Sequence, residues 1–458
     1  MAVQALTCRA RQLETVLAES ESWHRRLHWS RPEIEAHQQR LLRRLLAHAI
    51  DRSPFHAERL GPVDPSTFTL AQLRELPTMS KRDLMDEFDR VVTDPRVTRA
   101  AAEAHLATAG RELAHLDDAY VVMASGGSSG VRGVFVYDDE GFTSFVLTLV
   151  RETLHAVRAL GVTAERPVNG AIVAAGSTVH ATAAVARLVG VAPSPVRIHL
   201  APATLPFDEL LARLEQIQPV SLVAYGSILR RLAAAKADGR LSISPFAVGS
   251  TSEPFPAELR AEVERAFGVP AGNTFGSTEG LVGVAPPGQD AIRFAEDTSI
   301  IELVDAEGRP VAPGQEAAKV YLTNLANLAQ PLIRYELTDR FRQASGDWPD
   351  GHLRAVVAGR ADEVLRWGPI AIHPLVVRSV LVKQPAVLEH QVRQTPAGLD
   401  VAVVTSEAAA PLVEEIAAQL RAALADAGLR GADVVVRLVD RIERDPDTGK
   451  ARRFIPLP

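Results

Sequence analysis

The stretch Ser125-Gly126-Gly127-Ser128-Ser129-Gly130-Val131-Arg132-Gly133 lies between two apolar runs, at 119–123 and 134–137. It combines four glycines with three serines. Glycine allows the backbone to turn with positive φ and to approach a ligand closely. Successive backbone N–H groups in such a turn can converge on an anion. The stretch therefore predicts a strand–loop–strand unit whose loop binds phosphate.

Other glycine-rich motifs fit this loop less well. A Walker-type loop needs Gly-Lys-Ser/Thr at the start of a helix, but Val131 follows Gly130 here, and the spacing is not G-x-G-x-x-G either. Residues 126–130 match the G-x-S-x-G elbow of hydrolases, which leads from a strand into a helix. The β-prone residues 133–137 disfavour that elbow. For the loop alone, a flexible turn without a ligand remains open.

The composition bounds the class of protein. A chain of 458 residues exceeds one hydrophobic core and predicts two or three domains. Its 47% hydrophobic and 23% charged content is typical of a soluble globular protein. The net charge of −6, without a basic block, disfavours nucleic acid as a partner. A single cysteine, Cys8, excludes a disulfide framework and predicts a cytoplasmic protein. No apolar run suggests a signal peptide or a membrane span.

The order of apolar segments predicts an α/β fold in two parts. Residues 10–60 are helical in pattern, with leucines at 41, 42, 45 and 46, and short capped helices are expected at 69–73 and 80–84. Strands (171–174, 221–224) then alternate with helices (181–188, 207–217, 228–237, 258–267). Antiparallel strands are expected at 300–304 and 318–322, and a small α+β unit after Gly359, with a helix at 411–427 and a strand at 434–438.

These segments predict domain boundaries. We expect an N-terminal core at 1–358, including a helical segment to about residue 115, with its sheets flanked by helices and a β-rich subdomain. A small mobile C-terminal domain follows at 359–458, and the stretch 358–360 is the expected hinge.

Four further segments carry side chains suited to nucleotide chemistry. In Phe275-Gly276-Ser277-Thr278-Glu279-Gly280, the Thr and Glu can bind a phosphate oxygen and a divalent cation. Asp339 follows a polar turn and could accept two ribose hydroxyls. The segment 359–364 precedes Gly368, and Lys450 lies on a glycine-bearing loop near the chain end. Taken singly, each segment also has an ordinary explanation. Residues 275–280 fit a simple turn, and Asp339 fits a capping aspartate. The segment 359–364 fits an interdomain turn, and the Lys450 segment fits a solvated basic tail.

Taken in order, these segments resemble the adenylate-forming enzymes, the superfamily of acyl-CoA synthetases, adenylation domains and luciferases. Ser53-Pro54-Phe55-His56 and the segment Leu76–Leu84 are similar to the opening of its phenylacetate–CoA ligase branch. The resemblance extends from about residue 30 to 455. It implies ATP, Mg²⁺ and CoA, or the phosphopantetheine of a carrier protein, as cofactors and substrates.

The resemblance also assigns roles. It implies that Thr278 contacts the α-phosphate, that Glu279 holds Mg²⁺, and that Lys450 bridges the carboxylate and the α-phosphate. Asp362 falls at the hinge position, and Gly368 in the loop beside the thiol acceptor's tunnel. The implied phosphate-loop residues are Ser125, Gly126, Gly127, Ser128, Ser129, Gly130 and Arg132. The other implied nucleotide residues are Ser250, Ser252, Glu253, Phe275, Gly276, Ser277, Asp339 on the ribose and Arg360. The implied acid-pocket residues are His180, Tyr225, Gly249, Gly280 and Leu281.

The chain departs from the family pattern at three places. Val131-Arg132 replaces the usual Lys-Pro of the phosphate loop, and we hypothesise that Arg132 supplies the missing cation. Ser250-Thr251-Ser252 stands where many relatives carry glycines, and Leu337-Thr338-Asp339 where Thr-Gly-Asp is commoner.

The predicted function is ATP-dependent activation of an aryl or medium-sized carboxylic acid, followed by transfer to CoA. Two alternatives remain open: adenylation with transfer to a carrier-protein thiol, an amine or another nucleophile, and a catalytically degenerate nucleotide-binding protein. A homodimer is also left open.

Overall fold

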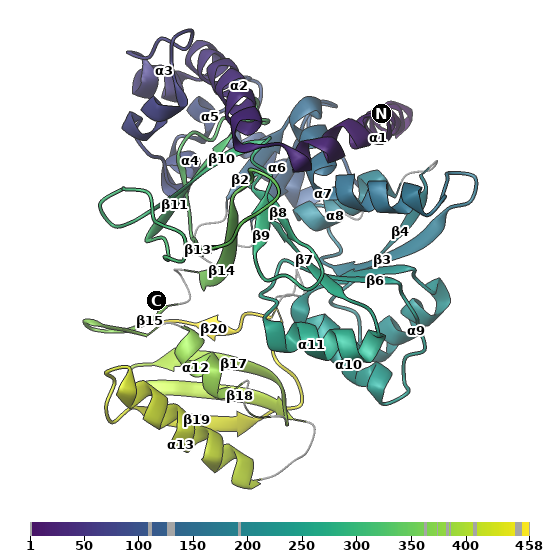
Figure 1. Ribbon diagram of the computed structural model, residues 1–458, viewed down its shortest axis with the longest axis vertical. Coiled ribbons are helices and arrows are strands. Elements are labelled where there is room, and N and C mark those ends of the chain that lie inside the picture. Colours follow the sequence, from purple (N-terminus) through teal and green to yellow (C-terminus); the bar gives the residue numbers. More distant parts are fainter. Residues whose placement is uncertain are drawn as a thin grey trace.

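A computed structural model (Figure 1) describes residues 2–108, 112–125, 133–190, 194–360, 364–372, 374–381, 384, 386–405, 410–444 and 451–457. The chain begins with a layer of helices. These are α1 (Ala2–Arg25), η1 (Arg26–His28), α2 (Arg31–Arg52), α3 (Pro54–Leu60), η2 (Leu70–Glu75), α4 (Lys81–Asp86), α5 (Phe88–Val91) and α6 (Arg99–Thr108).

The N-terminal helices start where capping side chains allow. Ser80 caps α4, and its capping box with Asp83 satisfies backbone donors that have no partner inside the helix. Thr69 forms a second capping box, but the segment after it winds as a 3₁₀ helix. On α2, leucines 42, 45 and 46 of the expected stripe are buried, whereas Leu41 is half-buried. The predicted helical segment is thus confirmed.

The glycine–serine stretch follows a strand and precedes a strand. Strands β1 (Val121–Ala124) and β2 (Val134–Tyr137) pair antiparallel, with Ala124 opposite Val134, and both are fully buried. The strand–loop–strand prediction is confirmed, although loop residues 126–132 lie outside the described residues. Helix α7 (Asp139–Ala159) begins only after β2, with Asp138 accepting from the Gly141 N–H at 2.7 Å.

The largest sheet within the described ranges has nine strands in the order β13-β14-β9-β8-β7-β6-β5-β3-β4. Five neighbours are parallel: β3 (Val168–Ala174), β4 (Val196–Pro202), β5 (Ser221–Ala224), β6 (Ala247–Thr251) and β7 (Ala271–Gly276). They alternate with α8 (Ala181–Val189), α9 (Phe207–Ile217), α10 (Gly226–Ala237) and α11 (Ala257–Phe267). Helices lie on both faces of this sheet (Figure 1), so the α/β prediction is confirmed.

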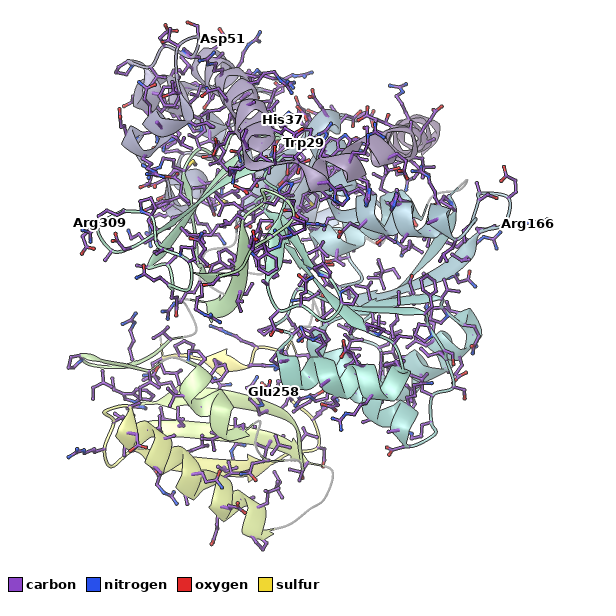
Figure 2. All side chains as sticks on the ribbon, in the orientation of Figure 1. Trp29, His37, Asp51, Arg166, Glu258 and Arg309 are labelled. Atoms are coloured by element: carbon purple, nitrogen blue, oxygen red, sulfur yellow. The ribbon has the colours of Figure 1, made fainter. Side chains whose placement is uncertain are left out.

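The other half of this sheet is antiparallel. It contains β8 (Val282–Ala285), β9 (Ile292–Phe294), β13 (Asp339–Gln343) and β14 (Arg354–Arg360). A separate sheet of β10 (Ser299–Val304), β11 (Lys319–Asn324) and β12 (Tyr335–Leu337) forms the predicted β-rich part. Figure 2 shows Arg309 at the outer tip of the turn between β10 and β11. The expected hinge at 358–360 forms the end of β14, where Gly359 pairs with Arg340.

The C-terminal part has its own hydrophobic core. A hairpin of β15 (Leu365–Trp367) and β16 (Ile370–Ile372) precedes α12 (Pro374–Leu381). The strands β17 (Val387–Thr395), β18 (Gly398–Thr405), β19 (Asp433–Leu438) and β20 (Phe454–Ile455) form a sheet, and α13 (Ala410–Asp426) packs on it. Figure 1 shows this part below the large sheet, beside α10 and α11. Among the helices that the structure describes, none has the length and apolar character needed to cross a bilayer.

Candidate active site

The predicted site residues gather where parallel strands end. Strands β3, β5, β6 and β7 run in the same direction and end at Ala174, Ala224, Thr251 and Gly276. Side chains that follow such strands share one edge of the sheet, where open α/β folds bind ligands. This edge carries Tyr225, Ser252, Glu253 and the segment Ser277–Glu279.

The turn that holds Glu279 is fixed by its backbone. The Ser277 N–H donates to the Leu281 carbonyl, and the Gly280 N–H donates to the Ser277 carbonyl, both at 3.0 Å. Gly280 has φ +98°, and a Cβ there would lie 2.1 Å from Asn324 Nδ2. That same Nδ2 donates to the Glu279 carbonyl at 2.9 Å. Only glycine fits at position 280 without displacing Asn324.

The hairpin β1–β2 contacts this turn directly. Tyr137 Oη, at the end of β2, donates to the Thr278 carbonyl at 2.7 Å. Thr278 Oγ1 donates to Glu279 Oε2 at 3.3 Å. The hairpin that carries the predicted phosphate loop therefore contacts the predicted metal-binding turn through its end opposite the loop, although 141 residues separate Tyr137 from Thr278 in sequence.

Lys81 completes this cluster, and the sequence reasoning missed it. Its Nζ lies 3.7 Å from Glu279 Oε1 and 3.4 Å from Ser125 Oγ. The Lys81 side chain is 15% exposed and that of Glu279 is 9% exposed. The capping serine, Ser80, sets the first turn of α4 and so directs the lysine at position 81 toward the loop. A lysine directly after a capping box, in a segment that matched the family's opening, was the available signal.

Three buried hydroxyls around this edge have no hydrogen-bond partner among the described residues: Ser250 Oγ, Ser277 Oγ and Tyr335 Oη. Buried polar groups are normally paired, so each is suited to a ligand. Burial raises the pKa of Tyr335 and of Tyr137, and the Glu279 carboxylate adds to both effects. Both phenols therefore remain protonated: Tyr137 donates to the Thr278 carbonyl, and Tyr335 can donate to a ligand.

The predicted ribose and nucleotide residues are brought together. Asp339 begins β13, and its Cα is the ladder partner of Arg360 at the end of β14. Lys450, Asp362 and the loop residues 126–130 and 132 lie outside the described residues, and so does the side chain of Arg360. Ser125 is described: its hydroxyl accepts from the Gly133 N–H at 2.9 Å and closes the base of the loop.

Glu253 makes contacts that the sequence did not suggest. Its carboxylate accepts from the Ser227 N–H at 2.8 Å, in the first turn of α10, and from the Ala451 N–H at 3.3 Å. Arg444 of the C-terminal part donates to Ser227 Oγ at 3.0 Å and to Glu389 at 2.9 Å. Glu253 thus links the predicted adenine segment to the residue that follows Lys450.

Ser252 is strained. It has φ +62°, in the left-handed region where glycine is favoured. Gly249, three residues earlier on β6, is the ladder partner of Val223, and a Cβ added there would make an ordinary contact with that side chain at 3.7 Å.

The remaining predicted residues differ in their burial and in their contacts. Tyr225 is buried, and its Oη accepts from the Ala175 N–H at 2.8 Å. His180 is the residue before α8 and is half-buried, whereas Leu281 is wholly buried in the core. Phe275 packs edge-to-face on Phe294 and Phe341, next to Gly276. Gly368 has φ +55° at the open tip of the β15–β16 hairpin.

Comparison with known proteins agrees with this fold. No family model matches the chain. The chain is 26% identical over 409 residues to a phenylacetate-coenzyme A ligase of Thermus thermophilus, and the match covers 84% of each protein. A 2-hydroxyisobutyryl-CoA ligase in its postadenylation state matches with a TM-score of 0.71 at 18% identity, over 94% of this chain and 91% of that chain. A benzoate CoA ligase from Burkholderia xenovorans LB400 matches with a TM-score of 0.51 at 20% identity, over 73% of this chain and 68% of that chain.

The large sheet and the small C-terminal part give the chain the fold of these solved CoA ligases. Its sequence is similar to those of phenylacetate–coenzyme A ligases, as the ordered motifs predicted.

Proposed function

We propose that the chain is an AMP-forming acid–CoA ligase. It activates a carboxylic acid with ATP, releases pyrophosphate and transfers the acyl group to CoA. The observation that carries the proposal is the Lys81–Glu279 pair, which adjoins Ser125 at the base of the glycine–serine loop. An ammonium group and a carboxylate group that are both held at the base of the predicted phosphate loop are suited to catalysing adenylyl transfer.

The first half-reaction requires positive charge at the site. A carboxylate is a poor electrophile, and AMP transfer converts it to a mixed anhydride with a good leaving group. Since this step joins two anions, fixed positive charge stabilises its transition state, and such preorganised electrostatics are usually the largest catalytic contribution. Lys81 is placed for the departing pyrophosphate, because its Nζ lies 3.4 Å from Ser125 Oγ. Lys450 is proposed for the carboxylate and the α-phosphate.

Glu279 and Thr278 fit a magnesium ion. A hard cation prefers oxygen ligands, and the Glu279 carboxylate is nearly buried beside the unpaired hydroxyls of Ser277 and Tyr335. Magnesium, when bound, supplies charge neutralisation at the transferring phosphate. The contribution of the chain is to hold the carboxylate: Asn324 fixes the Glu279 carbonyl, and Lys81 balances the carboxylate charge.

The second half-reaction is thiol attack on the acyl carbonyl. We propose that the small domain after Asp362 turns about that residue between the two steps, so that Lys450 leaves and the hairpin tip at Gly368 approaches, a hinge-type closure. The open surroundings of Gly368 support this role, since a tight approach there meets no side chain.

The proposal is tested by ATP–pyrophosphate exchange over a panel of aryl and medium-sized acids, followed by thioester detection after CoA is added. Exchange with at least one acid and thioester formation with CoA are expected. Absence of exchange across the panel would favour a degenerate nucleotide-binding protein. Exchange without a CoA product, but with acyl transfer to a carrier protein or an amine, would favour the alternative acceptors.

The Lys450→Ala variant separates the half-reactions. We expect loss of exchange, with thioester formation from preformed acyl-adenylate retained. An equal loss of both activities would refute the role given to Lys450.

A further inference from the structure

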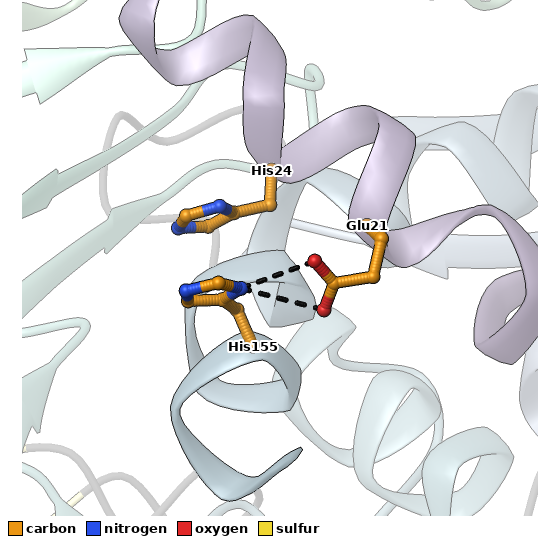
Figure 3. A group of neighbouring side chains, drawn as sticks. All are labelled: Glu21, His24 and His155. Carbon is orange, nitrogen blue, oxygen red and sulfur yellow. Dashed lines mark hydrogen bonds and ion pairs between the residues drawn. The ribbon is translucent and has the colours of Figure 1, made fainter. Parts of the chain in front are cut away.

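A side-chain cluster outside the predicted nucleotide site has the composition of a metal site. Glu21 and His24 lie three residues apart on α1, so they share one face of that helix. His155 projects from α7 toward them (Figure 3). One ligand atom from each of the three side chains lies within 4.8 Å of the others.

Both helices carry the same short pattern, Glu21-x-x-His24 on α1 and Glu152-x-x-His155 on α7. Paired Glu-x-x-His turns on facing helices are a recurrent way to build metal sites in helical proteins. Here Glu21, His24 and His155 come together, whereas Glu152 is ion-paired with Arg293. His28, one turn further along, lies edge-on to His24 with ring centroids 5.5 Å apart.

The distances suit one dication. His155 Nδ1 lies 3.1 Å from Glu21 Oε2. Two ligands of one tetrahedral zinc ion are separated by about 3.3 Å, given bond lengths near 2.0 Å. His24 stacks on His155 with centroids 3.7 Å apart and planes 7° apart, so the His24 ring must turn for its in-plane lone pair to meet an ion held by the other two, although the ligand atoms already lie within 4.8 Å of one another. All three side chains are half-buried, which leaves a path for the ion.

One cation already contacts the cluster. Arg158 is the competing cation, 3.2 Å from Glu21 Oε1. Its guanidinium also donates to Ser20 Oγ and the Leu17 carbonyl, so it can remain in place while Oε2 binds a metal.

We propose that Glu21, His24 and His155 bind a transition-metal dication of the zinc type, which fastens α1 to α7. Two imidazoles and one carboxylate are the ligands that zinc prefers over magnesium. His155 is six residues beyond Leu149 of α7, which lies beside Gly276 at the carboxyl edge, so roughly 9 Å of helix separates the two. None of the predicted nucleotide residues belongs to the cluster, and its proposed role is stabilising.

The test uses untagged, chelator-treated full chain with excess Mg²⁺, which occupies the carboxyl-edge site. Zn²⁺ is titrated against a chromogenic chelator, and Co²⁺ is followed by its visible absorption. We expect one tightly bound ion per chain, and roughly ten- to hundredfold weaker binding in each of His24→Ala and His155→Ala. The matched control is His48→Ala, a half-buried histidine on α2, which should bind as the wild type does.

A second measurement guards against misfolded variants. Zn²⁺ should raise the Tm of the wild type and of His48→Ala, a chelator should reverse the rise, and neither should change the Tm of His24→Ala. Unaltered Zn²⁺ affinity in the double variant His24→Ala, His155→Ala, or the absence of any zinc-dependent rise in wild-type Tm, would overturn the proposal.

Discussion

Replacement of Lys81 by methionine tests the cluster at the base of the phosphate loop. Methionine keeps most of the volume and removes the charge. The ammonium lies 3.7 Å from Glu279 Oε1, and at an effective dielectric of about 20 that separation corresponds to roughly 4 kcal/mol of Coulomb energy. Loss of one preorganised charge or donor from a transition state costs about 3–4 kcal/mol, or a factor of 10²–10³ in rate.

We therefore expect Lys81→Met to lower the rate of ATP–pyrophosphate exchange about 10²- to 10³-fold. Thioester formation from preformed acyl-adenylate should change little, because pyrophosphate has already left. Lys81→Arg should recover part of the exchange, since a guanidinium also binds phosphate. The assay is exchange at saturating acid, paired with single-turnover CoA acylation.

Lys319 provides a matched control. It forms a lysine–glutamate pair of nearly the same length, 3.6 Å to Glu336, but both side chains are substantially exposed, at 46% and 39%. Exposed ion pairs of this kind contribute about 0–1 kcal/mol to stability, so Lys319→Met should leave the rates of both half-reactions unchanged. If Lys81→Met retained wild-type exchange, or lost both half-reactions equally, the reasoning about Lys81 would be refuted.

The other predictions concern the metal ligand, the turn and one buried histidine. Glu279→Gln should raise the Mg²⁺ concentration needed for half-maximal exchange, and superimposable Mg²⁺ titrations would contradict this. Gly280→Ala should destabilise the fold by about 1–3 kcal/mol and impair exchange, because φ is +98° and the new Cβ would meet Asn324. The control is Gly268→Ala, where φ is +71° but no atom lies within 4 Å of the new Cβ. It should lower the free energy of unfolding by only about 1 kcal/mol and preserve activity. Equal urea midpoints in the two variants would count against the argument about the turn. Burial lowers the pKa of His56 to about 3, so the unfolded chain binds this proton first and stability falls as pH drops below about 6.5. Between pH 7 and 5, the wild type should lose about 2 kcal/mol more unfolding free energy than His56→Gln, and parallel losses would disprove this.

The sequence was informative where local pattern dominates. The helix at 207–217 and the strand at 221–224 have the predicted bounds, because an amphipathic period and flanking breakers determine them. Residues 358–360 were expected to form a hinge because Gly359 and Arg360 look like a turn. They extend β14 because β13 offers a free edge to pair with, which only the assembled sheet reveals.

The site residues also divide into those that local sequence predicts and those that it does not. Thr278 and Glu279 were predicted because they lie in one short motif. The approach of Lys81 to Ser125 and Glu279 depends on three distant segments, so no local pattern encodes it. This lysine also bears on the departure at Val131-Arg132: the cation lost from the loop has a candidate replacement on α4. Comparison of Lys81→Met with Arg132→Ala in the same exchange assay would show which of the two side chains stabilises the departing pyrophosphate.

The few contacts of Glu253 and Arg444 bear on the speed of turnover. The Ala451 N–H meets Glu253, and Arg444 meets Ser227, and each net hydrogen bond of this kind contributes only about 1–3 kcal/mol. When the tail departs, Glu253 keeps its bond to the Ser227 N–H and so is not left without a partner. In the proposed turning of the small domain, these bonds and the Arg231–Glu389 ion pair at 3.8 Å would break and re-form in each cycle, so the docked tail would act as a reversible latch.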